Sequence, residues 1–311
     1  MISETKSSQI NLRLQPALKE AAEKAAVQDH RSLTSLIEKL LADYLKTQPT
    51  LEDWHERVAV RFADILSEKK VPGDLNKKCR ILSYSIITSG GERLNPASLT
   101  RKLQAIHQGQ GSLISTPNLF YPYTRPEIAP YFTSDSRLKR GSADEILECG
   151  IFPDTAVLQG STGLWRVSPS GLATHVRPHF EDLDEFRKYG LEPGKWFCPF
   201  FMTRDLAELV FHAQSFSREF PSAQTIEFRC EFSGLLEREI GDARPLVSWL
   251  PGKIARVDHR ITTWECPAGD YLRAGWPEVV SALGAPVMRL FDPVFDYSSD
   301  WVREQSQWFR N

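Results

Sequence analysis

The segment QINLRL, residues 9–14, constrains the fold more than any other stretch of this chain. Polar and apolar residues alternate along it, which is the pattern of a β-strand with one apolar face and one hydrogen-bonding face. The polar face holds Gln9, Asn11 and Arg13, and the apolar face holds Ile10, Leu12 and Leu14. Helical sequence follows at once, so the strand has no evident partner strand nearby in its own chain.

Two amphipathic helices are expected after the strand. Pro16 suits the first turn of a helix, because its missing N–H would have no partner there. Apolar residues then recur at helical spacing over residues 18–26, until QDHR interrupts the pattern. Ser32 is a good N-cap for a second helix. That helix should run to about Lys46, because Pro49 prevents much further continuation.

A strand and two helices of this size cannot bury their own apolar faces, since domains below about 40 residues rarely stand alone without a staple. The five cysteines are scattered and include no CxxC pair, which favours neither a disulfide framework nor a zinc site. They are Cys79, Cys149, Cys198, Cys230 and Cys266. Dimerisation would bury these apolar faces without a disulfide or a metal ion. If two copies pair their QINLRL strands antiparallel, the apolar faces close a joint helical core and the polar faces lie together on the outside.

The sequence INLRLQPALKEAAEKAAVQDHRSLTSLIEKLLADYLK, within residues 8–47, resembles a ribbon-helix-helix domain. QINLRL is especially similar to the strand of Arc-like members of that family. The resemblance implies an obligate homodimer whose two-stranded ribbon enters the major groove of double-stranded DNA. The turn between the helices often carries glycine or asparagine in this family, whereas this chain has Asp29 and His30 there.

The resemblance also assigns DNA contacts residue by residue. It carries over Gln9, Asn11 and Arg13 as the base-contacting set. It carries over the start of the second helix as a clamp on a phosphate, formed by Arg31, Ser32, Leu33 and Thr34.

The chemistry of these residue types agrees with the assignment. Arginine can donate two hydrogen bonds to guanine, and asparagine or glutamine can pair with adenine, each contact giving roughly 1–3 kcal/mol of discrimination. Free N–H groups at a helix N-terminus favour a phosphate and fix the register without reading the sequence. The whole chain has a formal net charge of −2, so any DNA binding must come from a local face.

The sequence predicts an α+β protein with three segments: a ribbon-helix-helix domain at residues 1–48, a linker with an amphipathic helix at residues 49–72, and a larger α+β domain at residues 73–311. In the last segment CRILSYSIIT and TIEFRCEF are predicted strands, and KIARVDHRITTWEC is the predicted partner of TIEFRCEF. Asn95 or Ser98 could cap one helix and Thr203 another.

Candidate chemistry in the larger domain is sparse. HVRPHFED contains His175 and His179, which on a straight strand would lie about 13 Å apart and too far to share one metal ion directly, unless Pro178 bends the path. Asp258 and His259 are adjacent and would point to opposite faces of a strand. No nucleotide-binding, hydrolase or zinc-protease motif is present. We therefore predict no catalytic residue, no metal site and no cofactor.

Further segments are candidates for binding. Two basic groups could touch DNA beside the ribbon: one comprises Lys69, Lys70, Lys77, Lys78 and Arg80, and the other is RLKR at residues 137–140. The tyrosines of FYPYTRPEIAPYF, in a long irregular segment, are the best candidates for contact with a ligand.

These observations predict a bacterial or phage-type transcriptional regulator, a repressor or autoregulator, that binds an operator as a homodimer. Adjacent half-sites would recruit a second dimer. The larger domain would sense a small-molecule effector or mediate assembly. The alternative is a DNA-tethered effector enzyme, such as a nuclease or toxin, with an autoregulatory ribbon-helix-helix module. No apolar run is long enough to cross a bilayer and no secretory signal is present, so we expect a cytoplasmic protein without a membrane partner.

Overall fold

The computed structural model divides into two compact units, Met1–Pro49 and Thr50–Asn311. Each unit is described by itself. The described residues are 13, 15–47, 49–71, 75–110, 119–134, 145–152, 162–183, 192–241, 252–269, 271–307 and 309.

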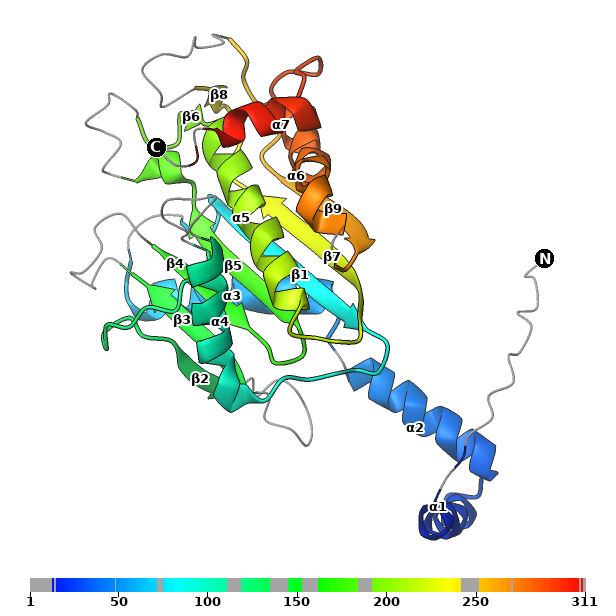
Figure 1. The fold of residues 1–311 in the computed structure, drawn as a ribbon. Helices are drawn as coiled ribbons and strands as arrows, with labels where there is room; N and C mark the ends of the chain where they lie inside the picture. Colours follow the sequence, from blue (N-terminus) through cyan, green and yellow to red (C-terminus); the bar gives the residue numbers. More distant parts are fainter. Residues whose placement is uncertain are drawn as a thin grey trace. The chain divides into compact units, whose positions relative to one another are not determined.

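The first unit contains the two predicted helices, α1 (Pro16–Gln28) and α2 (Leu33–Thr47) (Figure 1). Pro16 occupies the first turn of α1, as its sequence position predicts. The strand predicted at residues 9–14 lies outside the described residues except for Arg13, so the ribbon stays a prediction.

The second unit is built on a seven-stranded sheet in which every pair of neighbouring strands is antiparallel (Figure 1). Across the sheet the strands are β2 (Tyr131–Ser134), β3 (Glu145–Ile151), β4 (Gly163–Val167), β5 (Leu172–Pro178), β1 (Cys79–Thr88), β7 (Ala223–Phe232) and β9 (Arg260–Pro267). Two short strands, β6 (Trp196–Phe197) and β8 (Glu239–Ile240), pair in parallel. The predicted α+β class is confirmed.

Alternation along the sequence explains the central strands. CRILSYSIIT forms β1, and its first eight residues are buried because helices cover both faces of the sheet. In β7, Ile226, Phe228 and Cys230 face the core, as their spacing predicts. The predicted pairing of β7 with the later strand is confirmed, although β9 begins at Arg260.

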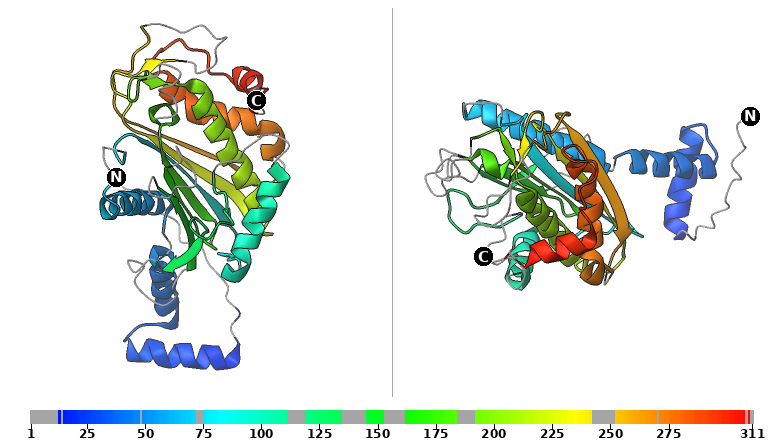
Figure 2. Two further views of the ribbon diagram at one scale, coloured as in Figure 1. Left: turned by 90° about the vertical axis from the view of Figure 1, so that its left-hand side faces the viewer. Right: turned by 90° about the horizontal axis from the view of Figure 1, so that it is seen from above.

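Helices cover the two faces of the sheet unequally (Figure 2). One face carries α4 (Pro96–Gln110), α5 (Pro199–Ser217), α6 (Tyr271–Met288) and α7 (Ser299–Ser306), and this side holds the larger apolar core. The other face carries α3 (Leu51–Glu68) over a smaller apolar cluster. Within the described ranges, every helix is too short or too polar to traverse a bilayer.

Helix α3 belongs to the second unit, although its sequence lies in the segment predicted as a linker at residues 49–72. Thr50 and Asp53 form a capping box at its start, in which each side chain accepts a hydrogen bond from the backbone N–H of the other. Trp54, Val58 and Phe62 pack against apolar residues of the sheet. Burial of this face makes α3 part of a folded core.

The predicted start of α5 at a Thr203 cap is wrong. The helix begins at Pro199, a residue suited to the first turn because it lacks an N–H. Thr203 lies one turn inside, where its hydroxyl donates a hydrogen bond to the Pro199 carbonyl oxygen at 2.7 Å. By contrast, Asn95 caps α4 as predicted, since its Oδ1 accepts from the Ala97 N–H at 3.0 Å.

Candidate nucleic-acid interface

The turn between α1 and α2 uses a histidine in a left-handed conformation. His30 has a φ of 52°, a value that favours glycine or asparagine. Its N–H bonds to the Val27 carbonyl oxygen, and the Arg31 N–H bonds to the Ala26 carbonyl oxygen. This pair of bonds is a Schellman motif. His30 therefore adopts a conformation that glycine or asparagine ordinarily takes at the end of a helix.

Helix α2 begins with an ordered cap. Ser32 Oγ accepts a hydrogen bond from the Ser35 N–H at 3.1 Å, and the Ser32 carbonyl oxygen accepts from the Leu36 N–H. The N–H groups of Leu33 and Thr34 have no intrahelical acceptor, since the first turn of any helix leaves its N–H groups free. These donors, together with the helix dipole, make the start of α2 attractive to a phosphate.

The predicted phosphate-contacting residues share one short surface segment. Arg31, Ser32 and Thr34 are exposed, and Leu33 is half-buried. The Arg31 guanidinium lies 3.1 Å from the Asp29 carboxylate, which also lies 3.3 Å from the Lys39 ammonium. Exposed pairs of this kind are worth about 0–1 kcal/mol, so Arg31 can exchange its partner for a phosphate at little cost.

The predicted base-contacting residues are described only in part. Arg13 is exposed, as a residue that reads DNA must be in the free protein. Gln9 and Asn11 lie outside the described residues.

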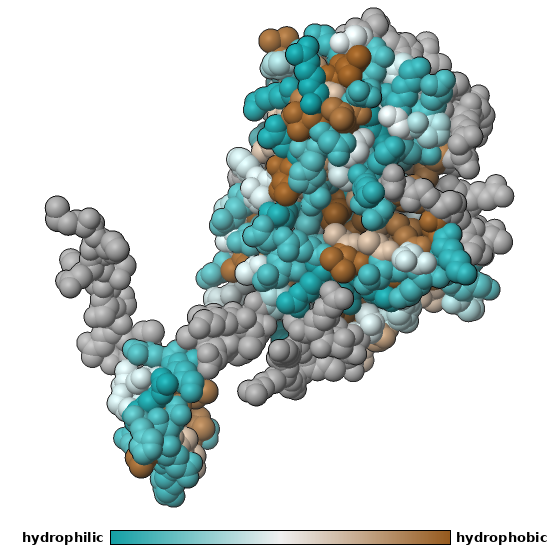
Figure 3. Space-filling model, turned by 180° about the vertical axis from the view of Figure 1, so that it is seen from behind, coloured by the Kyte–Doolittle hydropathy of each residue, from teal (hydrophilic) through white to brown (hydrophobic). Residues whose placement is uncertain are grey.

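The first unit exposes apolar side chains. Of the side chains described at residues 15–40, Ala26 and Leu36 are buried. Leu18 and Leu40 are each 57% exposed and Val27 is 73% exposed, and Figure 3 shows hydrophobic side chains at the surface of this unit. A unit this small with so much exposed apolar surface is typical of a subunit that buries it against a partner.

The first basic run, in the second unit, is only partly available to DNA. Lys69, Lys70, Lys77 and Lys78 are exposed. Arg80, however, is completely buried, so the idea that it touches DNA is wrong. It lies in β1 on the face covered by α5. The second basic run, residues 137–140, lies outside the described residues.

Arg80 is the centre of a buried ion network. Its guanidinium donates to both oxygens of Glu181, at 2.9 and 2.8 Å, and to Asp205 Oδ2 at 2.8 Å. Its Nε donates to His179 Nδ1 at 3.1 Å. Burial opposes the ionised form of Asp205, but Arg177, Arg80 and Arg204 hold the pKa of this carboxyl below its ordinary value.

This network accounts for the segment HVRPHFED. His179 and Glu181 bond to Arg80, and Asp182 accepts two bonds from the buried Arg238. Among the described residues, no group of three or more His, Cys, Asp or Glu side chains has the geometry to hold a metal ion. The segment that follows β5 is therefore tied to Arg80 of β1 and to Arg238 by buried ion pairs.

A second polar network, missed at the level of sequence, lies under α3. His55 Nδ1 is hydrogen-bonded to Ser83 Oγ at 2.8 Å, and His55 Nε2 to Glu231 Oε2 at 3.0 Å. The bond from His55, and then that from His259, hold the pKa of Glu231 below its usual value. Ser83 is completely buried and also bonds to Thr174, so a substrate cannot reach its hydroxyl. The sequence signal for this network is His55, a histidine on the apolar face of the predicted helix.

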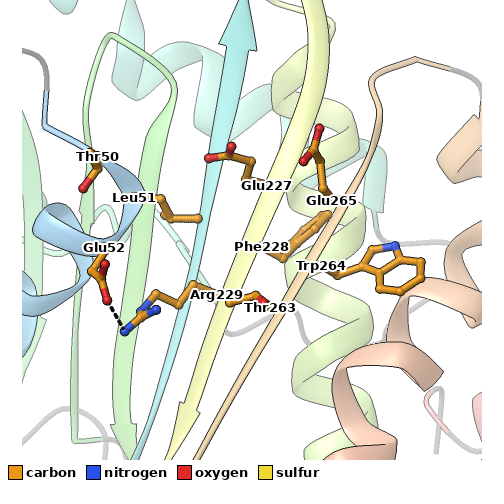
Figure 4. Close-up of a pocket in the computed structure, with 9 residues that line it drawn as sticks. All are labelled: Thr50, Leu51, Glu52, Glu227, Phe228, Arg229, Thr263, Trp264 and Glu265. Atoms are coloured by element: carbon orange, nitrogen blue, oxygen red, sulfur yellow. Dashed lines mark ion pairs between the residues drawn. The ribbon is translucent and has the colours of Figure 1, made fainter. Parts of the chain in front are cut away.

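A groove of about 590 Å³ lies between the start of α3 and strands β7 and β9 (Figure 4). Glu227 and Glu265 are directly opposite each other in the sheet. Burial raises the pKa of Glu227, and the neighbouring Glu265 raises it further. Arg229 is occupied by Glu52, whose carboxylate lies 3.0 Å away. This acidic groove would repel a phosphate, so the described candidate interface with DNA is confined to the first unit and the exposed lysines.

Comparison of the chain with protein-family models, with curated proteins and with solved structures finds no match. The assignment of function therefore depends on the residues and geometry described above.

Proposed function

We propose that this protein is a sequence-specific DNA-binding transcriptional regulator that acts as a ribbon-helix-helix dimer through residues 8–47. The observation that carries the proposal is the geometry of the turn between α1 and α2, together with the alternating sequence QINLRL that precedes α1. His30 closes α1 with a Schellman motif, and Ser32 caps α2 immediately afterwards. This arrangement leaves the first N–H groups of α2 without intrahelical acceptors, as a contact with a phosphate requires.

Base recognition is assigned to the polar face of the strand. In a dimer the ribbon would carry two copies each of Gln9, Asn11 and Arg13, matched to the two halves of a palindromic operator. Their side chains have the donors and acceptors that distinguish base pairs in the major groove. The start of α2 would hold a flanking phosphate and so fix the position of the ribbon.

Dimerisation is supported by the apolar surface of the first unit. Leu18, Val27 and Leu40 are more than half exposed in the single chain. Covering such side chains contributes roughly 1.5–3 kcal/mol each when burial is complete. A second copy that pairs its strand would provide this cover, and pairs of dimers on adjacent half-sites would raise the affinity further.

The second unit is proposed to sense a small-molecule effector or to mediate assembly of a repressor or autoregulator. The histidines of HVRPHFED are buried, and His179 is bonded to Arg80 and to the Ser233 carbonyl oxygen. A proton-transfer group needs access to a substrate. The burial of this segment therefore supports a regulatory domain over a DNA-tethered enzyme.

The proposal is tested by gel-shift titration of operator DNA with Asn11→Ala and Arg13→Ala. Each substitution removes two contacts from a dimer, so binding should weaken by about 2–6 kcal/mol, or at least 30-fold. Arg303→Ala is the matched control, because Arg303 forms exposed ion pairs in the second unit. Light scattering should show dimers for every variant. Operator affinity that is unchanged by both strand substitutions would exclude readout by the strand.

A further inference from the structure

A box of aromatic side chains encloses Phe120 between the sheet and helices α4 and α5. Phe120 is completely buried, and its ring stacks on His212 with the centroids 4.4 Å apart. The rings of His175, Tyr84 and Trp165 surround it at centroid distances of 6.0, 5.9 and 6.5 Å. The phenyl ring therefore fills a space shaped like one six-membered ring.

Three buried imidazoles at this box each have a ring nitrogen without a hydrogen-bond partner among the described residues. The atoms are His107 Nδ1, His175 Nδ1 and His212 Nε2. His107 and His175 are 6% exposed and His212 is 1% exposed. Leaving a buried polar atom unpaired costs roughly 1–3 kcal/mol, and most such atoms in folded proteins are satisfied. His175 and His212 contact the Phe120 ring, and the His107 ring lies next to His212 with the centroids 6.4 Å apart, so the unmet demand for hydrogen bonds gathers around this ring.

The other nitrogens of two of these rings are occupied. His107 Nε2 donates to the Leu119 carbonyl oxygen at 3.1 Å, which leaves Nδ1 as a bare acceptor. His212 Nδ1 is bonded to the Tyr84 hydroxyl at 2.8 Å, so the direction of that bond decides whether Nε2 donates or accepts. Burial lowers the pKa of both histidines, which keeps both rings neutral. Neutral rings suit a neutral ligand with its own donors and acceptors.

Phe120 is held in a strained conformation. Its φ of 57° lies in the left-handed region, where a bulky residue is an outlier. Strain of this kind typically costs about 1–3 kcal/mol and persists where the surroundings enforce it. The Leu119 N–H donates to Glu208 Oε2 at 2.9 Å, and the Tyr121 carbonyl oxygen accepts from Trp165 Nε1 at 3.2 Å. Hydrogen bonds therefore fix Leu119 and Tyr121, and they hold Phe120 in its left-handed conformation.

We propose that this box is a gated binding site for a planar six-membered nitrogen heterocycle of the pyrimidine type, whose ring takes the place of the Phe120 side chain. The ligand would stack on His212 and hydrogen-bond through its edge to His175 Nδ1, since the His175 ring lies nearly perpendicular to the Phe120 ring, at 80°. Aromatic walls with a few convergent polar atoms are typical of sites for small heterocycles. The proposal concerns the second unit and does not depend on DNA binding by the first.

Titration calorimetry of the full chain with cytosine, and with toluene as an apolar control, tests the site. Phe120→Gly removes the ring and suits the positive φ, so it opens the box without strain. Because the Phe120 ring no longer fills the site, a larger fraction of the protein is able to bind the ligand. We expect Phe120→Gly to bind cytosine at least 10-fold more tightly than the unchanged chain, and toluene at least 10-fold more weakly than cytosine. Equal affinity for the two compounds, or no gain for cytosine, would overturn the proposal.

Two further measurements address the imidazoles. Adding His175→Leu to Phe120→Gly should weaken cytosine binding at least 10-fold and leave toluene binding unchanged, because the hydrogen-bonding nitrogens are lost while an apolar side chain of similar size remains. In the unchanged chain, nitrogen NMR of labelled histidines should show shifts for His175 and His212 at millimolar cytosine. The exposed His30 is the internal control. Histidine signals that do not move would refute the site even if Phe120→Gly fails to fold.

Discussion

Mild acid should destabilise the second unit, because it folds around four neutral histidines. Burial is the largest cause that lowers the pKa of each ring, and it lowers that of His175 to about 3. An additional cause for His179 is the positive charge of the neighbouring Arg238 and Arg80. The four residues are His107, His175, His179 and His212.

The size of the effect follows from proton linkage. The unfolded chain has histidine pKa values near 6.5, above those of the folded rings. The stabilisation is therefore fully present above pH 6.5 and is lost as the pH falls from there towards the folded pKa values, because only the unfolded state takes up the protons. Between pH 7.5 and pH 5.5, His175, His179 and His212, whose folded pKa values are lowered far, should each cost about 1.4 kcal/mol. The three together cost about 4 kcal/mol, and the lowered pKa of His107 adds to this loss, against a total stability of roughly 5–15 kcal/mol.

Urea unfolding followed by tryptophan fluorescence at the two pH values measures this loss. His175→Leu should reduce the pH-dependent loss by about 1.4 kcal/mol, because one proton fewer is taken up. His30→Asn, which removes an exposed histidine of the first unit, should leave the loss unchanged. A difference of less than 1 kcal/mol between pH 7.5 and pH 5.5 in the unchanged chain would refute the assignment of four neutral buried histidines.

Two further substitutions probe other parts of the structure. Glu181→Gln leaves the buried Arg80 short of a counter-charge, and urea unfolding should show a loss of about 3–5 kcal/mol, against under about 1 kcal/mol for the exposed Glu278→Gln. His30→Gly should stabilise the turn of the first unit by roughly 0.5–1 kcal/mol, seen as slower hydrogen exchange in α1, whereas Gln28→Gly in helical geometry should speed exchange.

Local sequence patterns predicted the individual elements well. A β-rich run predicted β1, alternation predicted β7, and the pairing of β7 with β9 followed from a second β-rich run. The periodic apolar residues of α3 predicted a helix, because a helix that buries one face must repeat every 3.6 residues. These patterns depend on contacts within a few residues and can therefore be read from the sequence.

The order of strands and the buried ion network could not be predicted, because they depend on residues far apart in the chain. Arg80 follows two lysines, so it reads as part of a solvated basic run. It is buried because β1 lies between β5 and β7, and its partners Glu181 and Asp205 are 101 and 125 residues away. No local pattern encodes such a pairing.

The sequence predicted the two parts of the candidate DNA interface, the start of α2 and the N-terminal strand, to different degrees. The start of α2 follows from Ser32, whose side chain makes the cap that its sequence position predicts. The left-handed turn was not signalled by a glycine, and His30 occupies it because a histidine tolerates this conformation better than most residues. The strand assignment of Gln9 and Asn11 depends on sequence alternation alone.

Footprinting of the intact protein on genomic DNA tests recognition by the N-terminal strand most directly. A ribbon-helix-helix regulator should protect a defined palindromic sequence, including one near its own promoter, and Asn11→Ala with Arg13→Ala should remove that protection. Protection that is absent, that shows no preferred sequence, or that persists unchanged in the double variant would contradict operator recognition by these residues.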